Sequence, residues 1–255
     1  MKVNWTPLQD ELDLWRQQDL SLPLWWRDDD AQRPTDQLTE LVALSEAVGL
    51  PVHLAVIPDG AVPELARLID QTPSLIPVVH GWAHQSHAPA GQKKAEFGAH
   101  RPMPQIVADA SNGLHRLQDL FGEALVPLFV PPWNRIDPEV VAALPALGYR
   151  AISTYLPRKT ALAAPQLLQV NTHLDPINWR GDRSLVPPDA LVEQVTQQLR
   201  DRRMGGADNA EPYGVLTHHL VHDRAIWDFT GSLLKRLLAG PGRIWTAHDI
   251  KDTKR

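Results

Sequence analysis

The chain contains no cysteine. This absence excludes disulfide bonds and thiolate metal sites, so a metal ion in this protein must be bound by His, Asp or Glu. A chain without cysteine also suits a reducing compartment. The first ten residues include no apolar segment of the kind that a secretory signal requires. We therefore expect a cytoplasmic protein.

The sequence also lacks a net positive charge and long apolar runs. The formal net charge is −5, so the sequence offers no basic surface for nucleic acid. No apolar run is long enough to span a bilayer, which predicts a protein without a membrane span. What the sequence does have is 255 residues of ordinary globular composition and nine tryptophans. Tryptophans serve most often in packing, but a cleft that is rich in them suits stacking on sugar rings.

Short apolar runs alternate along the chain with segments of helical periodicity. We expect strands over residues 23–27, 52–57, 75–79, 125–130, 149–154, 167–171, 213–217 and 244–246, and helices over 8–19, 35–48, about 61–69, 106–121, 138–147, 188–203 and 225–238. This alternation predicts the α/β class, with a parallel sheet that is covered on its faces. Seven or eight such units favour a (β/α) barrel over an open sheet. We expect one domain over residues 1–255, with residues 1–22 as an N-terminal helical extension.

Polar clusters rich in His, Asp and Asn follow five of the expected strands. They come after residues 23–27, 75–79, 125–130, 167–171 and 213–217. In a (β/α) barrel the C-terminal ends of the strands converge on one mouth, where active sites lie. The placement of these clusters therefore predicts a functional site at the mouth.

A metal site is the best interpretation of two of these clusters. His80 and His84 are four residues apart after an apolar run, a spacing that brings two imidazoles within reach of one ion. Two histidines do not fill a coordination sphere, and the carboxylates Asp28, Asp29 and Asp30 follow another strand. Taken alone, those aspartates also fit a solvated turn or a helix N-cap. At a shared mouth, one could bind the metal while its neighbour acts as a base.

The other clusters offer an acid and binding surfaces. His218 follows a strand and could serve as a general acid, with Asp175 or Asp223 holding its tautomer, although a polar strand end is the simpler interpretation. Trp133 and Trp179 fit either ordinary packing or platforms for a substrate.

Taken in order, these stretches resemble the motifs of the NodB-type polysaccharide deacetylases, the family 4 carbohydrate esterases. The Thr-Phe-Asp-Asp-Gly motif of that family resembles the stretch from Trp26 to Asp30. Carried over, Asp28 would be the general base and Asp29 a metal ligand. The His-x-x-x-His motif matches His80 and His84, which would supply two further ligands. The resemblance covers most of the chain and implies a distorted (β/α)7-8 barrel.

Three later motifs of the family follow in the same order. Arg-x-Pro-x looks like the stretch around Trp133 and Asn134, with its arginine missing. Asp-x-x-Asp-Trp looks like Asp175 to Trp179, with asparagine in place of its second aspartate. Leu-x-His matches the stretch that ends at His218, which implies that this histidine is the general acid.

The departures from the family pattern point to a divergent branch, and the lack of a secretory signal leads us to expect an intracellular one. The missing arginine normally holds the catalytic aspartate, and Arg27 or Arg135 could replace it. Asp30 stands where the family has glycine, which adds a charge and leaves the choice of base open by one residue.

Three functional hypotheses follow. The first is a metal-dependent deacetylase that uses a divalent ion, zinc by preference, on an acetylated carbohydrate. The second is a sugar-binding or regulatory pseudoenzyme on the same barrel, which the missing arginine motivates. The third is a glycoside hydrolase that uses Asp28 or Asp30 with Asp175, but it leaves the histidines without a role.

Overall fold

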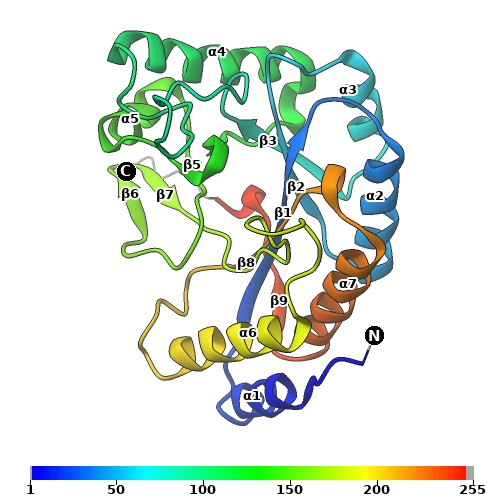
Figure 1. Cartoon of the computed structure of the whole chain (residues 1–255). Helices are drawn as coiled ribbons and strands as arrows, with labels where there is room; N and C mark the ends of the chain where they lie inside the picture. The colour runs from blue at the N-terminus through cyan, green and yellow to red at the C-terminus, as the bar shows by residue number, and fades with distance from the viewer. Residues whose placement is uncertain (1, 251–255) are drawn as a thin grey trace.

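The computed structural model describes residues 2–250 and is organised around a nine-stranded, mostly parallel sheet (Figure 1). The strands are β1 (Leu22–Ala31), β2 (Val52–Val56), β3 (Leu75–His80), β4 (Leu128–Val130), β5 (Ala151–Ile152), β6 (Leu162–Ala164), β7 (Leu167–Gln169), β8 (Tyr213–Thr217) and β9 (Gly242–Ile244). Every side chain of β2 and β3 is buried, as expected for strands that helices or other strands cover on both faces.

The strand order is β6-β7-β5-β4-β3-β2-β1-β8, and β9 pairs with β1. Among the paired strands within residues 2–250, only β6 and β7 run antiparallel to each other. Two parallel bridges join the sheet beyond its regular strands: Leu174 pairs with Val215 of β8, and Tyr155 pairs with Thr172. The segment after β7 thus links β8 back to the β5 side. This closure, with helices between most parallel strands, confirms the predicted α/β fold of a distorted barrel.

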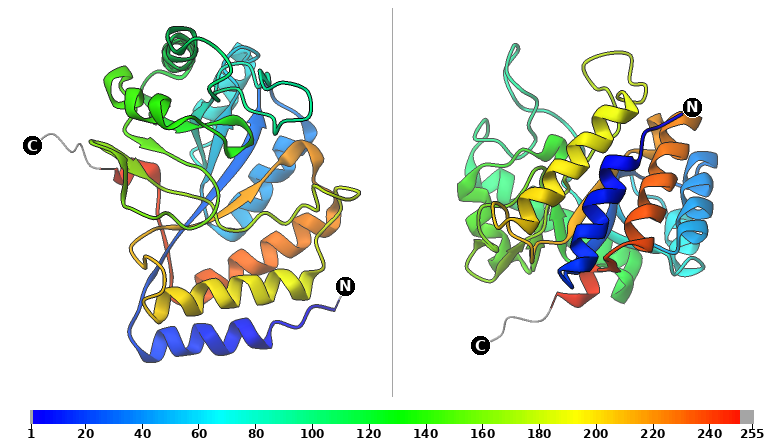
Figure 2. Two further views of the ribbon diagram at one scale, coloured as in Figure 1. Left: turned by 60° about the vertical axis from the view of Figure 1, so that its left-hand side comes forward. Right: turned by 90° about the horizontal axis from the view of Figure 1, so that it is seen from below.

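The helices surround this sheet. They are α1 (Thr6–Gln17), α2 (Asp36–Val48), α3 (Pro63–Asp70), α4 (Met103–Phe121), α5 (Pro138–Ala143), α6 (Pro188–Arg203) and α7 (Arg224–Ala239). Helix α2 has the ends that its sequence predicts: the Thr35 side chain accepts a hydrogen bond from the Leu38 amide, and Gly49 ends the helix in the left-handed conformation. Figure 2 shows α1, which lies before the first strand, packed alongside α6.

The main difference from the expected elements is in β1. The three aspartates were expected to end this strand, yet β1 continues through all of them to Ala31. Carboxylates are costly inside a sheet only when they lack partners. Here each aspartate has a cationic or polar side chain beside it, so the strand runs on to the barrel mouth.

No helix within residues 2–250 combines the length and apolar character that crossing a membrane requires.

Candidate active site

A cleft of about 670 Å³ opens at the C-terminal ends of the parallel strands. It draws at least one residue from each of the five polar clusters that the sequence analysis placed at the mouth. The residues that line it are Asp29, Asp30, His80, His84, Lys94, Trp133, Asn134, Arg135, Tyr155, Asp175, Ile177, Trp179, Arg183, Leu216, His218 and Val221. Asp28 is not one of them.

Three potential metal ligands converge in this cleft. An oxygen of Asp30 lies 3.1 Å from Nε2 of His80 and 3.2 Å from Nε2 of His84. One donor atom from each of the three side chains falls within 4.8 Å of the others. Ligands held about 2.0–2.2 Å from one ion lie roughly 3 Å apart, so these separations suit a single divalent cation. The sequence analysis expected Asp29 in the place that Asp30 takes.

A bulge in β1 explains this offset of one residue. The pairing with β2 shifts between Asp28 and Ala31, and Asp30 adopts a left-handed φ of 79°. In a regular strand, successive side chains point to opposite faces, so Asp29 and Asp30 could not both face the cleft. The extra residue of the bulge turns Asp30 toward the histidines. A bulge of this kind has no clear signature in the sequence.

The hydrogen bonds of His80 fix the tautomer that a metal site needs. Its Nδ1 lies 3.0 Å from the carbonyl oxygen of Val130 and donates to it, which leaves Nε2 directed at Asp30. Burial opposes a charge on this ring, but the carboxylates of Asp29 and Asp30 outweigh burial and raise the pKa of His80. The same carboxylate arrangement that attracts a proton also attracts a metal cation.

Asp29 forms a buried ion pair with Arg27. The guanidinium donates from Nη2 to Oδ2 of Asp29 at 3.0 Å, and Nε lies 2.9 Å from Oδ1. Arg27 also donates to Oδ1 of Asn134 and to the hydroxyl of Ser153, so its orientation is fixed from three sides. Of the two arginines that could replace the missing family arginine, Arg27 is thus the one that contacts an aspartate of the cleft.

Asp28 points away from the cleft and is fully buried. Its carboxylate lies 2.5 Å from Nδ1 of His219 and accepts hydrogen bonds from the Thr217 hydroxyl and the His219 amide. Burial raises the pKa of a carboxyl, but the charge and hydrogen bond of His219 more than offset it and lower the pKa of Asp28. This pairing joins β1 to the turn after β8, so Asp28 serves to hold these two segments together.

His218 lies in the cleft, as the sequence analysis expected. Its ring makes an edge contact with Trp179 at 4.8 Å between centroids. The Trp179 indole donates to Asp175 at 2.7 Å, so Asp175 orients the tryptophan that borders the histidine. Burial raises the pKa of Asp175, and the neighbouring His218 counteracts only part of this effect.

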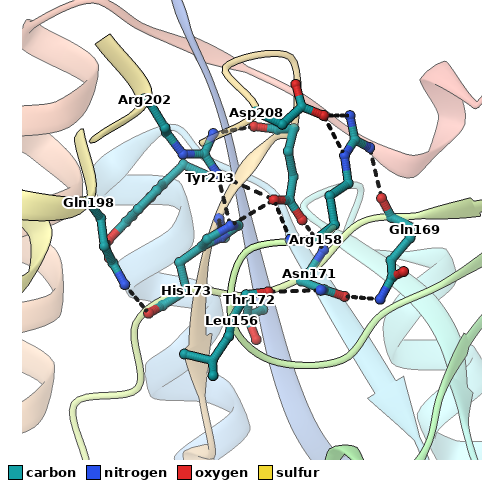
Figure 3. Close-up of polar contacts among 12 residues, drawn as sticks. Leu156, Arg158, Gln169, Asn171, Thr172, His173, Gln198, Arg202, Asp208 and Tyr213 are labelled. Atoms are coloured by element: carbon teal, nitrogen blue, oxygen red, sulfur yellow. Dashed lines mark hydrogen bonds and ion pairs between the residues drawn. The ribbon is translucent and has the colours of Figure 1, made fainter. Parts of the chain in front are cut away.

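A buried polar network holds the segment that leads to Asp175 (Figure 3). Glu211 accepts hydrogen bonds from the amides of Asn171 and Arg158 at 3.1 and 3.0 Å. Nε2 of His173 lies 3.2 Å from the same carboxylate, while its Nδ1 accepts the Gly214 amide of β8. Because these contacts join the segment to β8, they fix the part of the barrel wall that carries Asp175.

Trp133 and Asn134 lie in a tight turn after β4, and both have left-handed backbone conformations, with φ of 57° and 55°. The Trp133 ring lies 4.3 Å from the ring of His84, measured between centroids. Strained backbone of this kind collects at functional sites. His84 and Asp30 share the same feature, with φ of 55° and 79°.

Glu96 is a site residue that the sequence analysis missed. It is buried, and its carboxylate accepts hydrogen bonds from the amides of Ala83 (2.8 Å), Trp82 (3.2 Å) and Gln85 (3.3 Å), which surround His84. A side chain at Gly81 would collide with this carboxylate, which shows how closely the loop wraps it. In the sequence, the one sign of this role is an acidic residue between two apolar ones, Ala95 and Phe97. Both of these neighbours are buried in the structure.

Removing the Glu96 carboxylate should weaken metal binding. In a Glu96→Ala variant the three amides around His84 lose their acceptor, and the loop no longer holds this ligand in place. We expect an affinity for Zn²⁺ about 10–100-fold lower than that of the unaltered protein. Calorimetric titration of the metal-free protein measures this change, and Glu123→Ala, at an exposed position, is the control. An unchanged affinity in a folded Glu96→Ala variant would contradict this role.

Comparison with known proteins gives similarity in structure but not in sequence. No family model matches the chain, and no curated protein matches it in sequence. Its structure is similar to a family 4 carbohydrate esterase from Streptomyces lividans in complex with acetate, with a TM-score of 0.55, 14% identity, and coverage of 91% of this chain and 97% of that one.

Two further solved structures share the fold. One is a mutant of the CE4 family pseudoenzyme BA3943 with restored enzymatic activity (TM-score 0.55, 12% identity, 90% and 67% coverage). The other is a family 4 acetyl xylan esterase from Clostridium thermocellum in complex with a cobalt ion (TM-score 0.51, 12% identity, 89% and 89% coverage). The chain therefore has the fold of these family 4 proteins, as its motifs led us to expect.

Proposed function

We propose that this chain, on the fold it shares with the family 4 carbohydrate esterases, is a metal-dependent hydrolase that removes an acetyl group from an acetylated sugar. The observation that supports this most is the convergence of Asp30, His80 and His84 in the cleft at the barrel mouth. A second carboxylate, Asp29, lines the same cleft beside them. A binding protein has little need for a carboxylate pair of this kind next to two histidines.

The donor set fits a divalent cation. One carboxylate and two imidazoles are ligands that zinc accepts, and a catalytic site keeps further positions open for water and substrate. The acetyl xylan esterase, which has this fold, was solved in complex with a cobalt ion, and this supports a metal site here. In this chain Asp30, His80 and His84 would hold the ion, which when bound would polarise the acetyl carbonyl and acidify a nearby water.

Two residues of the chain then carry out the proton transfers, one as a base and one as an acid. Asp29, oriented by Arg27, takes the proton of the attacking water, so the base is one residue later than the resemblance implied. The water oxygen bonds to the acetyl carbon, and the bond from that carbon to the sugar nitrogen or oxygen breaks. His218 gives a proton to the departing amine or alkoxide. The products are acetate and the deacetylated sugar.

Arg27 bears on the alternative of a pseudoenzyme. That hypothesis was motivated by the missing arginine of the family motif. Arg27 supplies a guanidinium to Asp29 from within β1 itself, and Asn134 and Ser153 hold it there. This contact supports a catalytic site over a pseudoenzyme.

Metal removal tests the proposal. The purified protein should contain about one equivalent of a divalent metal, release acetate from an acetylated sugar, and lose that activity on chelation. Activity should return when Zn²⁺ or Co²⁺ is added back. Elemental analysis and an acetate assay provide the readouts. Acetate release that survives complete chelation would exclude the metal mechanism, and sugar binding without any acetate release would favour the pseudoenzyme.

A further inference from the structure

The rim of the cleft carries three cations that the proposed chemistry does not use. Lys94, Arg135 and Arg183 all line the cleft. Arg135 donates a hydrogen bond to the backbone carbonyl of Lys94 at 2.8 Å, which directs its guanidinium but does not neutralise it. Within residues 2–250, none of the three forms an ion pair with a carboxylate.

The carboxylates of the cleft are already engaged elsewhere. Asp29 is paired with Arg27, and Asp30 lies between His80 and His84. Asp175 accepts hydrogen bonds from the Trp179 indole and the Ile177 amide. Within residues 2–250, none of these carboxylates forms an ion pair with Lys94, Arg135 or Arg183, so the three cations remain unpaired. This is notable in a chain with a formal net charge of −5, because the rim then attracts anions against the overall charge.

Two of the cations are each associated with a tryptophan of the cleft. Nζ of Lys94 lies 5.8 Å from the centre of the Trp133 ring, and the guanidinium carbon of Arg183 lies 6.0 Å from that of Trp179. A pyranose that stacks on either indole would have its substituents within reach of a cation. Guanidinium groups bind phosphate and carboxylate with two parallel hydrogen bonds.

We propose that the natural substrate is an acetylated saccharide that carries an anionic group, a phosphate or a carboxylate, and that Lys94, Arg135 and Arg183 bind this group. The inference rests on the proposed deacetylase function and narrows its substrate class. It also gives Trp133 and Trp179 a role beside the cations, as the surfaces on which the charged sugar stacks.

Calorimetry with three acetylated sugars tests the proposal. The probes are N-acetylglucosamine, its 1-phosphate, and N-acetylmuramic acid, which carries a carboxylate. We expect at least one anionic sugar to bind about tenfold more tightly than the neutral one, with a preference that falls as salt is added. Which anionic sugar binds more tightly identifies the group. Equal affinities for all three probes would overturn the proposal.

Matched variants show where the preference arises. Arg135→Gln and Arg183→Gln should each reduce the ratio of anionic to neutral affinity several-fold, whereas Arg67→Gln, at an exposed arginine of α3, should leave that ratio unchanged. Asp30→Asn removes a proposed metal ligand. A preference for anionic sugars that this variant keeps arises at the rim and not at the metal. A preference that survives in the Arg135→Gln, Arg183→Gln double variant would contradict the proposal.

The two proposals can fail independently. Acetate release from neutral sugars with no preference for anionic ones would leave the deacetylase and remove the anion site. Tight binding of an anionic sugar without acetate release would leave the anion site and remove the deacetylase.

Discussion

Replacing Asp29 by asparagine is expected to lower kcat by about 10²–10⁴-fold while the protein keeps its metal. Asparagine has nearly the same shape but cannot take a proton. In the structure Asp29 faces the cleft and Arg27 holds its carboxylate at 2.9–3.0 Å, whereas the proposed metal ligands are Asp30 and the two histidines. Steady-state kinetics together with metal analysis of the purified variant measures both parts of the prediction.

The matched control is Asp30→Asn. This change weakens the proposed metal site itself, so the variant should lose bound metal as well as activity. The two neighbouring variants thus give opposite results in the metal analysis. If Asp29→Asn lost its metal and Asp30→Asn kept it, the roles would return to the assignment that the sequence motif alone implies.

The sequence was sufficient to predict the fold and to predict that segments far apart in the chain lie together at one site. Apolar runs at regular intervals predicted parallel strands, and polar residues after His80, Thr217 and the other strand ends predicted one shared mouth. These inferences depend only on periodicity and on the rule that parallel strands end on the same side. The structural similarity to the family 4 esterases confirms the fold.

The sequence was not sufficient to assign roles to the three aspartates. A choice among Asp28, Asp29 and Asp30 depends on which side chain points where, and a bulge changes that direction by one residue. The bulge interrupts the pairing with β2, and His80, which Asp30 then contacts, lies 50 residues away in the sequence. Motif matching aligns letters and therefore cannot detect it.

Residues that act through the backbone were also beyond sequence reasoning. Glu96 lies between the expected strand over 75–79 and the expected helix over 106–121, and it accepts three hydrogen bonds from amides near His84. A side chain that accepts hydrogen bonds from backbone amides leaves no pattern in the sequence of the segment that it holds. Two of the three rim cations, Lys94 and Arg183, were also missed, since no sequence motif marks them and only the folded chain brings them to the cleft.

Replacing Asp28 by asparagine should reduce the free energy of unfolding by about 3–5 kcal/mol, because it breaks a buried ion pair and leaves His219 without its partner. Asp28 is fully buried, and its two oxygens accept three hydrogen bonds from Thr217 and His219. Asparagine can accept at one oxygen only, and its amide group would face donors. Urea unfolding of the variant and the unaltered protein measures the difference.

The exposed pair Arg224–Asp228 provides the control for this prediction. Asp228→Asn removes an ion pair whose side chains are 81% and 62% exposed, so it should change stability by no more than about 1 kcal/mol. Asp28→Asn should also keep its bound metal, because no ligand atom is altered. A stable Asp28→Asn variant with intact metal but no turnover would instead assign the base to Asp28, since only a proton-transfer role would then explain the loss. The combination of stability, metal content and kcat therefore separates the structural aspartate from the catalytic one.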